Sequence, residues 1–320
     1  MRLAIGLIVG LAAGFLSARY VVPRKAEVAA STHEWRRNMT ELRIGLTGPE
    51  NAAARAGRLD QYKKRLSDHL GIPVSLVQTS DYAGLVQGIT SKQIDMAIIG
   101  ASGYAAMVEE SHGNVEPLVT NREVDGSMGY YAALFVRADG PIHTFADLKG
   151  KTIAYPDANS TSGYLFPRHV MRQRGIDPDA FFAKSGFAGG HVQAVVAVMQ
   201  KQYDAGVTWT SGTGKLEEGY SRGIFRQMAL AAPPQLAMKD VRIIELFGLI
   251  PNGPVVVRKD MPQEAKDILR GVLTTLHYED RTTFESVAGG QGQGYVPIPP
   301  SFYQQIVELR AAEKEVQRNK

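Results

Sequence analysis

The chain has 320 residues, a hydrophobic fraction of 44% and a formal net charge of +4 at pH 7, which allows two domains with well-filled cores. It contains no cysteine, and this excludes thiol catalysis, thiolate metal sites, disulfides and a lipid-modified N-terminal cysteine. Its lysines and arginines are scattered, without a basic run or interleaved aromatic residues, so nucleic-acid binding is not indicated.

An uncharged stretch lies close to the N-terminus. Residues 3–18 carry no charge and are flanked by Arg2 and Arg19. This is the length of a signal-peptide core and is short for a membrane span. Residues 1–40 are therefore predicted to form a signal peptide, or an N-terminal anchor, followed by a polar linker.

The anchor alternative rests on three glycines spaced four residues apart, a pattern that suits close helix packing in a membrane: Gly6, Gly10 and Gly14. In that case residues 3–22 tether the protein to the inner membrane. With either alternative, residues from about 40 onward are expected in the periplasm.

Strands and helices alternate after residue 40. Apolar runs predict strands at 42–46, 73–77, 94–99 and 116–120. Helical spacing is found at Leu59, Tyr62, Leu66 and Leu70, and again at Leu85, Val86 and Ile89. This alternation implies an α/β fold with a parallel sheet, whose ligands bind beyond the carboxyl ends of the strands. The turns at Thr47, Asp81 and Gly100 are therefore expected at one edge of a cleft.

Two β-rich segments, 130–139 and 254–260, end alike, with an arginine, one further residue and an aspartate. We interpret them as crossings between two α/β lobes. Lobe 1 is then discontinuous, formed by 41–135 and 256–320, and lobe 2 is formed by 136–255. Two crossings between two lobes make a hinge that can close on a ligand.

A hydroxyl-rich turn lies between the predicted strand 152–155 and a helix expected from Tyr164 to Arg174. The first N–H groups of a helix have no partner inside it, and the helix dipole places partial positive charge there. Three hydroxyl donors join this site: Ser160, Thr161 and Ser162. The pattern predicts an anion site. The alternative is that one hydroxyl only caps the helix.

The chain resembles the periplasmic substrate-binding proteins of phosphonate, phosphite and phosphate ABC transporters over about residues 42–310. The resemblance rests mainly on 157–164 with Pro167. Supporting segments are 81–84, 93–97, 190–191 and 203–206. It implies the two-lobed, type II periplasmic-binding-protein fold, with two parallel-type sheets joined by two hinge crossings.

The resemblance also implies a site without cofactor or metal. The oxyanion would be held by five residues: Tyr82 of lobe 1, and Ser160, Thr161, Ser162 and His191 of lobe 2. Short hydroxyl donors and helix N-termini bind such an anion without a formal counter-charge. His191 directly precedes an apolar helix, so its ring is expected to face the cleft. The alternative for His191 is an exposed capping residue.

Two departures from the family pattern bear on the ligand. Ile99 stands where some members have a second tyrosine, and Gly253 lies where aminoalkyl-phosphonate binders have an acidic residue for the ligand amine. The sequence therefore favours phosphate, phosphite or a methyl-type phosphonate over a 2-aminoethyl ligand.

The sequence lacks the motifs of the enzyme classes that bind similar groups. There is no Gly-x-Ser-x-Gly elbow, and a phosphate loop around Gly212–Lys215 fails because Trp209 and Leu216 replace required residues. The histidines show no paired metal-ligand spacing. The protein is thus expected to be a monomeric binding protein, not an enzyme. Its partner is a membrane permease of an ABC transporter or, alternatively, a membrane sensor kinase.

Overall fold

The computed structural model describes residues 34–47 and 52–318. The uncharged stretch and the glycine repeat lie outside the described residues. The predicted linker is wrong for residues 34–40. Glu34–Arg37 form a 3-10 turn, and Trp35 and Met39 are buried in the first hydrophobic core. Within the described ranges, no helix is both long and apolar enough to cross a membrane.

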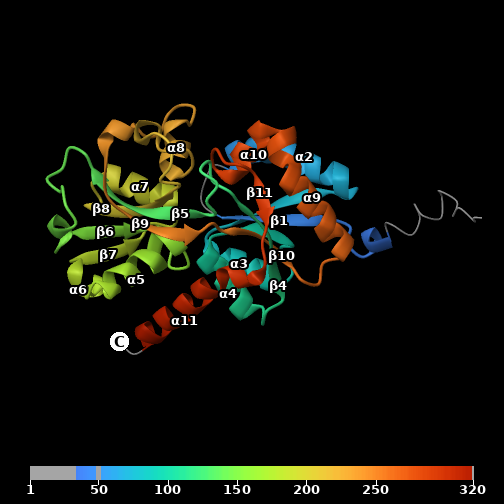
Figure 1. Cartoon of the computed structure of the whole chain (residues 1–320), viewed down its shortest axis with the longest axis horizontal. Coiled ribbons are helices and arrows are strands. Elements are labelled where there is room, and N and C mark those ends of the chain that lie inside the picture. The colour runs from blue at the N-terminus through green and yellow to red at the C-terminus, as the bar shows by residue number, and fades with distance from the viewer. Residues whose placement is uncertain (1–33, 48–51, 319–320) are drawn as a thin grey trace, which may run out of the picture.

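Two β-sheets, each covered by helices, form the two lobes (Figure 1). The first sheet has the order β11-β4-β10-β3-β1-β2, with the bounds β1 (Leu42–Thr47), β2 (Val74–Thr79), β3 (Met96–Ile98), β4 (Val115–Asn121), β10 (Pro254–Arg258) and β11 (Tyr295–Pro297). The second has the order β7-β6-β8-β5-β9, with the bounds β5 (Gly129–Arg137), β6 (Thr152–Tyr155), β7 (Lys184–Phe187), β8 (Ala205–Thr210) and β9 (Val241–Pro251).

Helices follow the strands in both lobes. Those of lobe 1 are α2 (Ala52–Leu70), α3 (Tyr82–Thr90), α4 (Ala101–Glu110), α9 (Gln263–Glu279), α10 (Arg281–Ala288) and α11 (Gln304–Arg318). Those of lobe 2 are α5 (Phe166–Gln173), α6 (Pro178–Phe181), α7 (His191–Met199) and α8 (Ile224–Ala229). Apolar side chains fill both faces of each sheet, which accounts for the near-continuous apolar strands in the sequence.

The predicted α/β, two-lobed fold is confirmed, and the sheets contain antiparallel strands besides the parallel ones. β1 pairs in parallel with β2 and β3, and β6 with β7 and β8. β10 runs antiparallel to β3 and β4, and β5 antiparallel to β8 and β9. β11 also runs antiparallel to β4, so the strands that oppose the direction of the others are β10 and β11 in the first sheet and β5 in the second.

The lobe boundaries need correction. The predicted boundary at 135/136 falls inside β5, which lies wholly in the second sheet, and the boundary at 255/256 falls inside β10, which lies in the first. The chain changes sheets at 122–128 and again at 252–253. The segments 130–139 and 254–260 resemble each other because both are strands. The crossings are the short connections before them, 122–128 and 252–253.

The C-terminal helix α11 packs on α4 of lobe 1 and extends under lobe 2 (Figure 1). There Arg310 Nη2 donates to Asn159 Oδ1 at 2.8 Å. Glu313 is buried and forms ion pairs with Arg168 and Arg172 of α5. The helix therefore connects the two lobes on the side opposite α8 and α10.

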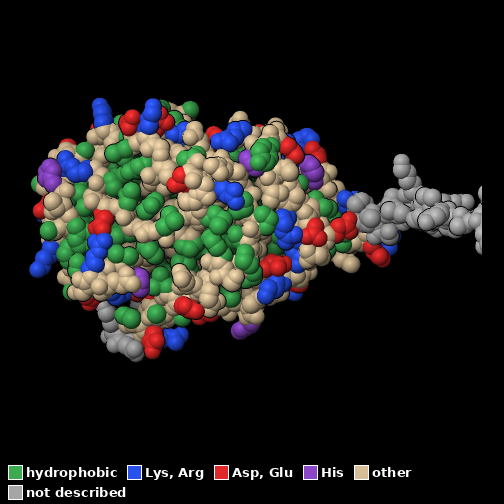
Figure 2. All heavy atoms as spheres, in the orientation of Figure 1, with side chains coloured by type: hydrophobic (Ala, Val, Ile, Leu, Met, Phe, Trp, Pro, Cys, Tyr) green, Lys and Arg blue, Asp and Glu red, His purple; other side chains and the backbone are tan. Residues whose placement is uncertain are grey.

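The surface shows no gathering of positive charge on the face in Figure 2, where lysine and arginine side chains are interspersed with acidic ones. This agrees with the scattered basic residues of the sequence.

Candidate oxyanion site

A cavity of about 260 Å³ lies between the lobes. It is lined from lobe 1 by Tyr82, Ile99 and Gly100, from lobe 2 by Ser160, Thr161, Ser162 and His191, and from the second crossing by Asn252 and Gly253, among others. The structure thus brings all five residues predicted from the sequence to one cavity, from positions as far apart in the chain as 82 and 191.

The central turn follows β6 directly. Asp157 Oδ1 accepts the N–H of Asn159 at 2.7 Å, and Ser160 Oγ accepts the N–H of Gly163 at 3.0 Å. Ser160 is therefore the N-cap. A Cβ on Gly163 would lie 2.6 Å from Pro156 Cγ, so this close turn requires glycine.

The helix begins earlier than expected and in a different form. Thr161–Leu165 make a π-helical turn, and α5 continues it from Phe166, with Pro167 in its opening turn as predicted. Such π-turns occur often at functional sites. The turn leaves Thr161 and Ser162 on the cavity wall although both residues are otherwise buried.

His191 lies at the start of α7 and is held by two hydroxyl groups. Its Nε2 lies 3.1 Å from Ser160 Oγ, and its Nδ1 lies 3.1 Å from Thr208 Oγ1. Burial lowers the pKa of His191 from 6.5 to about 3, so the ring is neutral at neutral pH. It is not the exposed capping residue of the alternative interpretation.

Helix N-termini converge on the cavity from both lobes. Asp81 caps α3, whose first residue is Tyr82. The N-cap positions of α4 and α7 are Gly100 and Gly190, which offer no capping side chain. Together with the N-terminus of the π-turn and α5, four helix dipoles place partial positive charge at the cavity.

Besides the hydrogen bond from Arg310 to Asn159, two contacts join the central turn to lobe 1. The N–H of Ser102, in the first turn of α4, donates to Thr161 Oγ1 at 2.7 Å. Asp157 accepts the backbone N–H of Tyr82, a hydrogen bond that lowers the pKa of the Asp157 carboxyl. Burial has the larger effect and raises this pKa above its ordinary value. The N-termini of α3 and α4 are therefore in contact with the turn.

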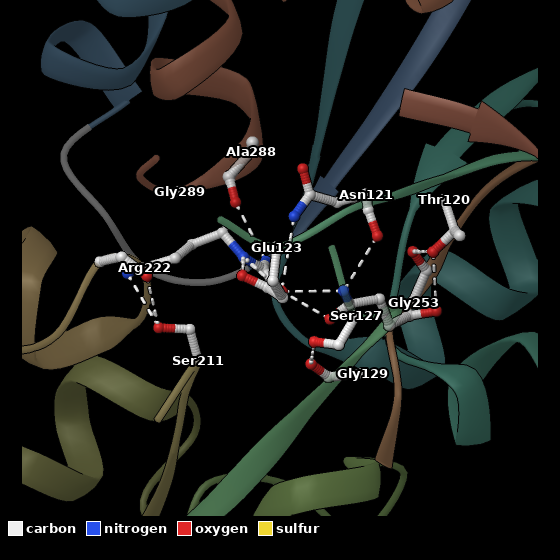
Figure 3. Close-up of polar contacts among 12 residues, drawn as sticks. Thr120, Asn121, Glu123, Ser127, Gly129, Ser211, Arg222, Gly253, Ala288 and Gly289 are labelled. Carbon is white, nitrogen blue, oxygen red and sulfur yellow. Dashed lines mark hydrogen bonds and ion pairs between the residues drawn. The ribbon is translucent and has the colours of Figure 1, made fainter. Parts of the chain in front are cut away.

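Arg222, which lines the cavity, belongs to a buried ion pair (Figure 3). Arg222 of lobe 2 pairs with Glu123 of the first crossing, and its guanidinium also donates to Asn252 Oδ1 at 2.6 Å and to the carbonyl of Ala288 at 3.2 Å. The Asn252 amide in turn donates to Glu123 Oε1 at 2.8 Å. Arg222 lines the cavity, but Glu123 neutralises its charge.

Sequence reasoning missed several lining residues, among them Tyr130, Trp209 and Arg222. Tyr130 is the first residue of the predicted segment 130–139, and neither it nor Trp209 belongs to a ligand-binding motif. Arg222 belongs to no motif, and its partner Glu123 is 99 residues away in the chain. Among the residues that the structure describes, no group of His, Cys, Asp or Glu side chains is arranged to hold a metal ion.

Comparison with solved structures agrees with the two-lobed fold. A structure of a binding-protein component of an ABC phosphonate transporter from Pseudomonas aeruginosa has a TM-score of 0.71 at 23% identity, covering 86% of both chains. The PhnD1 structure from Prochlorococcus marinus, in complex with methylphosphonate, also has a TM-score of 0.71, at 17% identity, covering 86% of this chain and 98% of that one. At these identities the likeness shows the fold.

The family follows from sequence. The model of the family described as ABC transporter, phosphonate, periplasmic substrate-binding protein matches residues 45–303, and this chain belongs to that family. The phosphonates-binding periplasmic protein of Escherichia coli K12 is 29% identical over 283 residues, which are 86% of this chain and 77% of that protein. The phosphate-import protein PhnD of Mycolicibacterium smegmatis is 30% identical over 174 residues, 52% of this chain and 54% of that protein.

Proposed function

We propose that this protein binds a phosphorus oxyanion, such as a phosphonate, phosphite or phosphate, in the cavity between its lobes and delivers it to the permease of an ABC transporter. The observation that carries the proposal is the convergence of three hydroxyl side chains, a neutral histidine and four helix N-termini on one cavity. The oxyanion-binding residues would be Tyr82, Ser160, Thr161, Ser162 and His191.

The Ser160–His191 contact explains how the turn could donate to an anion. In the neutral ring with hydrogen on Nε2, that N–H donates to Ser160 Oγ, which also accepts the N–H of Gly163. The Ser160 hydroxyl hydrogen is then free to donate to an oxyanion oxygen. In this tautomer Nδ1 accepts the hydroxyl hydrogen of Thr208, whose Oγ1 lies 3.1 Å away.

The same contact favours binding over hydrolysis. A serine beside a histidine resembles a nucleophile and its base, but a histidine whose pKa lies at about 3 is a weak general base near neutral pH. The second ring nitrogen contacts a hydroxyl, Thr208 Oγ1, where a catalytic triad would place a carboxylate. We therefore propose a protein that binds its ligand and does not transform it.

Isothermal titration calorimetry against phosphate, phosphite, methylphosphonate, arsenate and sulfate tests the proposal. We expect binding of at least one of the three phosphorus oxyanions, with sulfate much weaker. Binding of sulfate in preference to all three phosphorus species, or of none of the ions, would contradict the proposal.

We also propose that the protein is exported and that its N-terminal segment is cleaved, because the uncharged stretch 3–18 is short for a membrane span. N-terminal sequencing of the protein from a periplasmic fraction should show a start beyond residue 18. Recovery only from membranes, with Arg2 retained, would support the anchor.

A further inference from the structure

The cavity is larger than an oxyanion alone needs. A water molecule accounts for about 30 Å³ of liquid volume, and one tetrahedral oxyanion does not fill about 260 Å³. In the present arrangement of the lobes the remaining space is available to a substituent on the ligand, and the residues around it indicate the chemistry of that substituent.

Much of the remaining wall is apolar. It is formed in lobe 1 by Leu46 of β1, Leu59 of α2, Leu76 of β2 and Val287 of α10, and in lobe 2 by Trp209 of β8. The side chains that pack against the cores on one side and are only partly buried are Leu46, Leu76, Val287 and Trp209. Partly buried apolar side chains inside a cavity are typical of a site that an apolar group covers.

Trp209 is held in place on this wall. The Arg222 guanidinium lies 4.8 Å from the centre of its ring, and the edge-on ring of Tyr130 lies 6.1 Å away. These contacts fix the indole as a flat apolar surface before any ligand arrives, so little conformational entropy is lost when a group packs on it.

The wall is unsuited to a positively charged substituent. Among the described lining residues there is no Asp, Glu or Lys, and Arg222 is neutralised by Glu123. At position 253, a Cβ would lie 2.2 Å from the Ile99 carbonyl oxygen, so the backbone of the β3–α4 turn excludes a side chain there. An ammonium group in this space would lose its hydration without gaining a counter-charge.

We propose that the natural ligand is a phosphonate whose phosphorus carries an apolar alkyl or aryl group, and that this group occupies the apolar part of the cavity. The inference rests on the proposed function, since it requires the phosphonate head group to bind at Ser160–Ser162. It differs from the smaller ligand expected from the sequence, because the sequence does not show which apolar side chains face the cavity.

The test compares three phosphonates by calorimetry on the whole exported chain. Propylphosphonate and 2-aminoethylphosphonate have nearly the same shape and differ in a methyl against an ammonium group. Methylphosphonate supplies the head group with a minimal substituent. Each buried methylene contributes about 0.8 kcal/mol, which is about four-fold in affinity, so propylphosphonate should bind about 15-fold more tightly than methylphosphonate. It should also bind at least about ten-fold more tightly than 2-aminoethylphosphonate.

Two variants of neighbouring residues locate the effect. Leu76 lines the cavity, whereas Val77 in the same strand points to the opposite face of the sheet and packs against the second core. Leu76→Ala should reduce the preference for propylphosphonate over methylphosphonate by about three-fold or more. Val77→Ala should leave that preference unchanged, and thermal melts should establish that both variants are folded.

The outcomes separate the two proposals. If methylphosphonate binds and propylphosphonate binds no more tightly, or if 2-aminoethylphosphonate binds best, the apolar subsite is wrong while the oxyanion site stands. If the expected order holds but Leu76→Ala and Val77→Ala do not differ, the apolar subsite lies elsewhere and the inference is also wrong. If no phosphonate, phosphite or phosphate binds, the proposed function fails and the subsite with it.

Discussion

Ser160 and Thr161 differ in what their hydroxyl groups contact. Ser160 Oγ accepts the Gly163 N–H and caps the helix, whereas Thr161 Oγ1 accepts the N–H of Ser102 from the opposite lobe. The turn therefore combines a helix cap at Ser160 with a contact between the lobes at Thr161, and in the proposed site both hydroxyl groups also donate to the anion.

Thr161→Ala should weaken oxyanion binding, and it should also lower the free energy of unfolding, because the buried N–H of Ser102 loses its acceptor. A hydrogen bond to a charged group contributes about 1.5–3 kcal/mol, so the dissociation constant should rise by about 10- to 150-fold. Ser160→Ala should in addition lower the free energy of unfolding by about 1 kcal/mol, because it removes the cap. Calorimetry and denaturant unfolding on both variants check this. A Thr161→Ala protein that binds as tightly as the parent would show that the hydroxyl is structural.

The neutral state of His191 predicts a pH dependence of stability. Its folded-state pKa of about 3 lies below the ordinary value of 6.5, so the unfolded chain binds this proton first as the pH falls. Between pH 6.5 and about 3, His191 should therefore reduce stability by up to about 1.4 kcal/mol per pH unit, and above 6.5 it should have no effect.

Denaturant unfolding of the parent and of His191→Asn from pH 8 to pH 4 gives the free energy of unfolding at each pH. The contribution of His191 is the difference between the two proteins in the slope of this free energy against pH. The parent should lose stability more steeply than the variant below pH 6.5, and the two should run parallel above it. Parallel curves over the whole range would mean that His191 is not held neutral.

At the scale of single elements, α11 acts on both lobes. Glu313 has a side chain only 8% exposed and pairs with Arg168, whose side chain is 3% exposed, and with Arg172. Arg168 has a further partner in Asp179 at 2.8 Å. Without the Glu313 charge, the buried guanidinium groups lose one of the carboxylates that balance their charge. Arg168 still pairs with Asp179.

Glu313→Gln should thus lower the free energy of unfolding by about 3 kcal/mol, the low end of the range for a broken buried ion pair. It should also weaken ligand binding, because α11 connects lobe 1 to α5. Glu315→Gln removes the same charge from an exposed position of the same helix and is the matched control. Equal effects of the two substitutions would argue against a connection between the lobes through α11.

At the scale of the whole molecule, two short crossings, 122–128 and 252–253, join the lobes. Arg222 pairs with Glu123 in the first crossing and donates to Asn252 in the second. Backbone contacts nearby also bridge the lobes, including the N–H of Gln291 donating to the Ser221 carbonyl at 2.9 Å. Because the crossings contain no helix, rotation about them needs few changes of backbone angle.

We therefore expect ligand binding to close the lobes. Small-angle scattering should give a smaller radius of gyration with a binding oxyanion than without it. The control is an equal concentration of an anion that calorimetry shows not to bind. An unchanged radius with saturating, calorimetrically verified ligand would rule out a hinge of measurable amplitude.

The sequence by itself determined the α/β class, most strands and helices and the central turn. These features depend on residues that are near one another in the chain. Examples that the structure contains are the helical spacing of Leu59, Tyr62 and Leu66, the Asp81 cap and the position of Pro167. The resemblance then identified five residues that the fold brings to one cavity.

Only the tertiary structure decided the rest. It placed β5 in the second sheet, buried Trp35 and Met39, and paired Arg222 with Glu123. It also decided which apolar side chains face the cavity and which face a core. Each of these features depends on residues that are distant in the chain and meet in space. Burial and ion pairing at such contacts produce no periodic pattern or motif in the sequence around either residue.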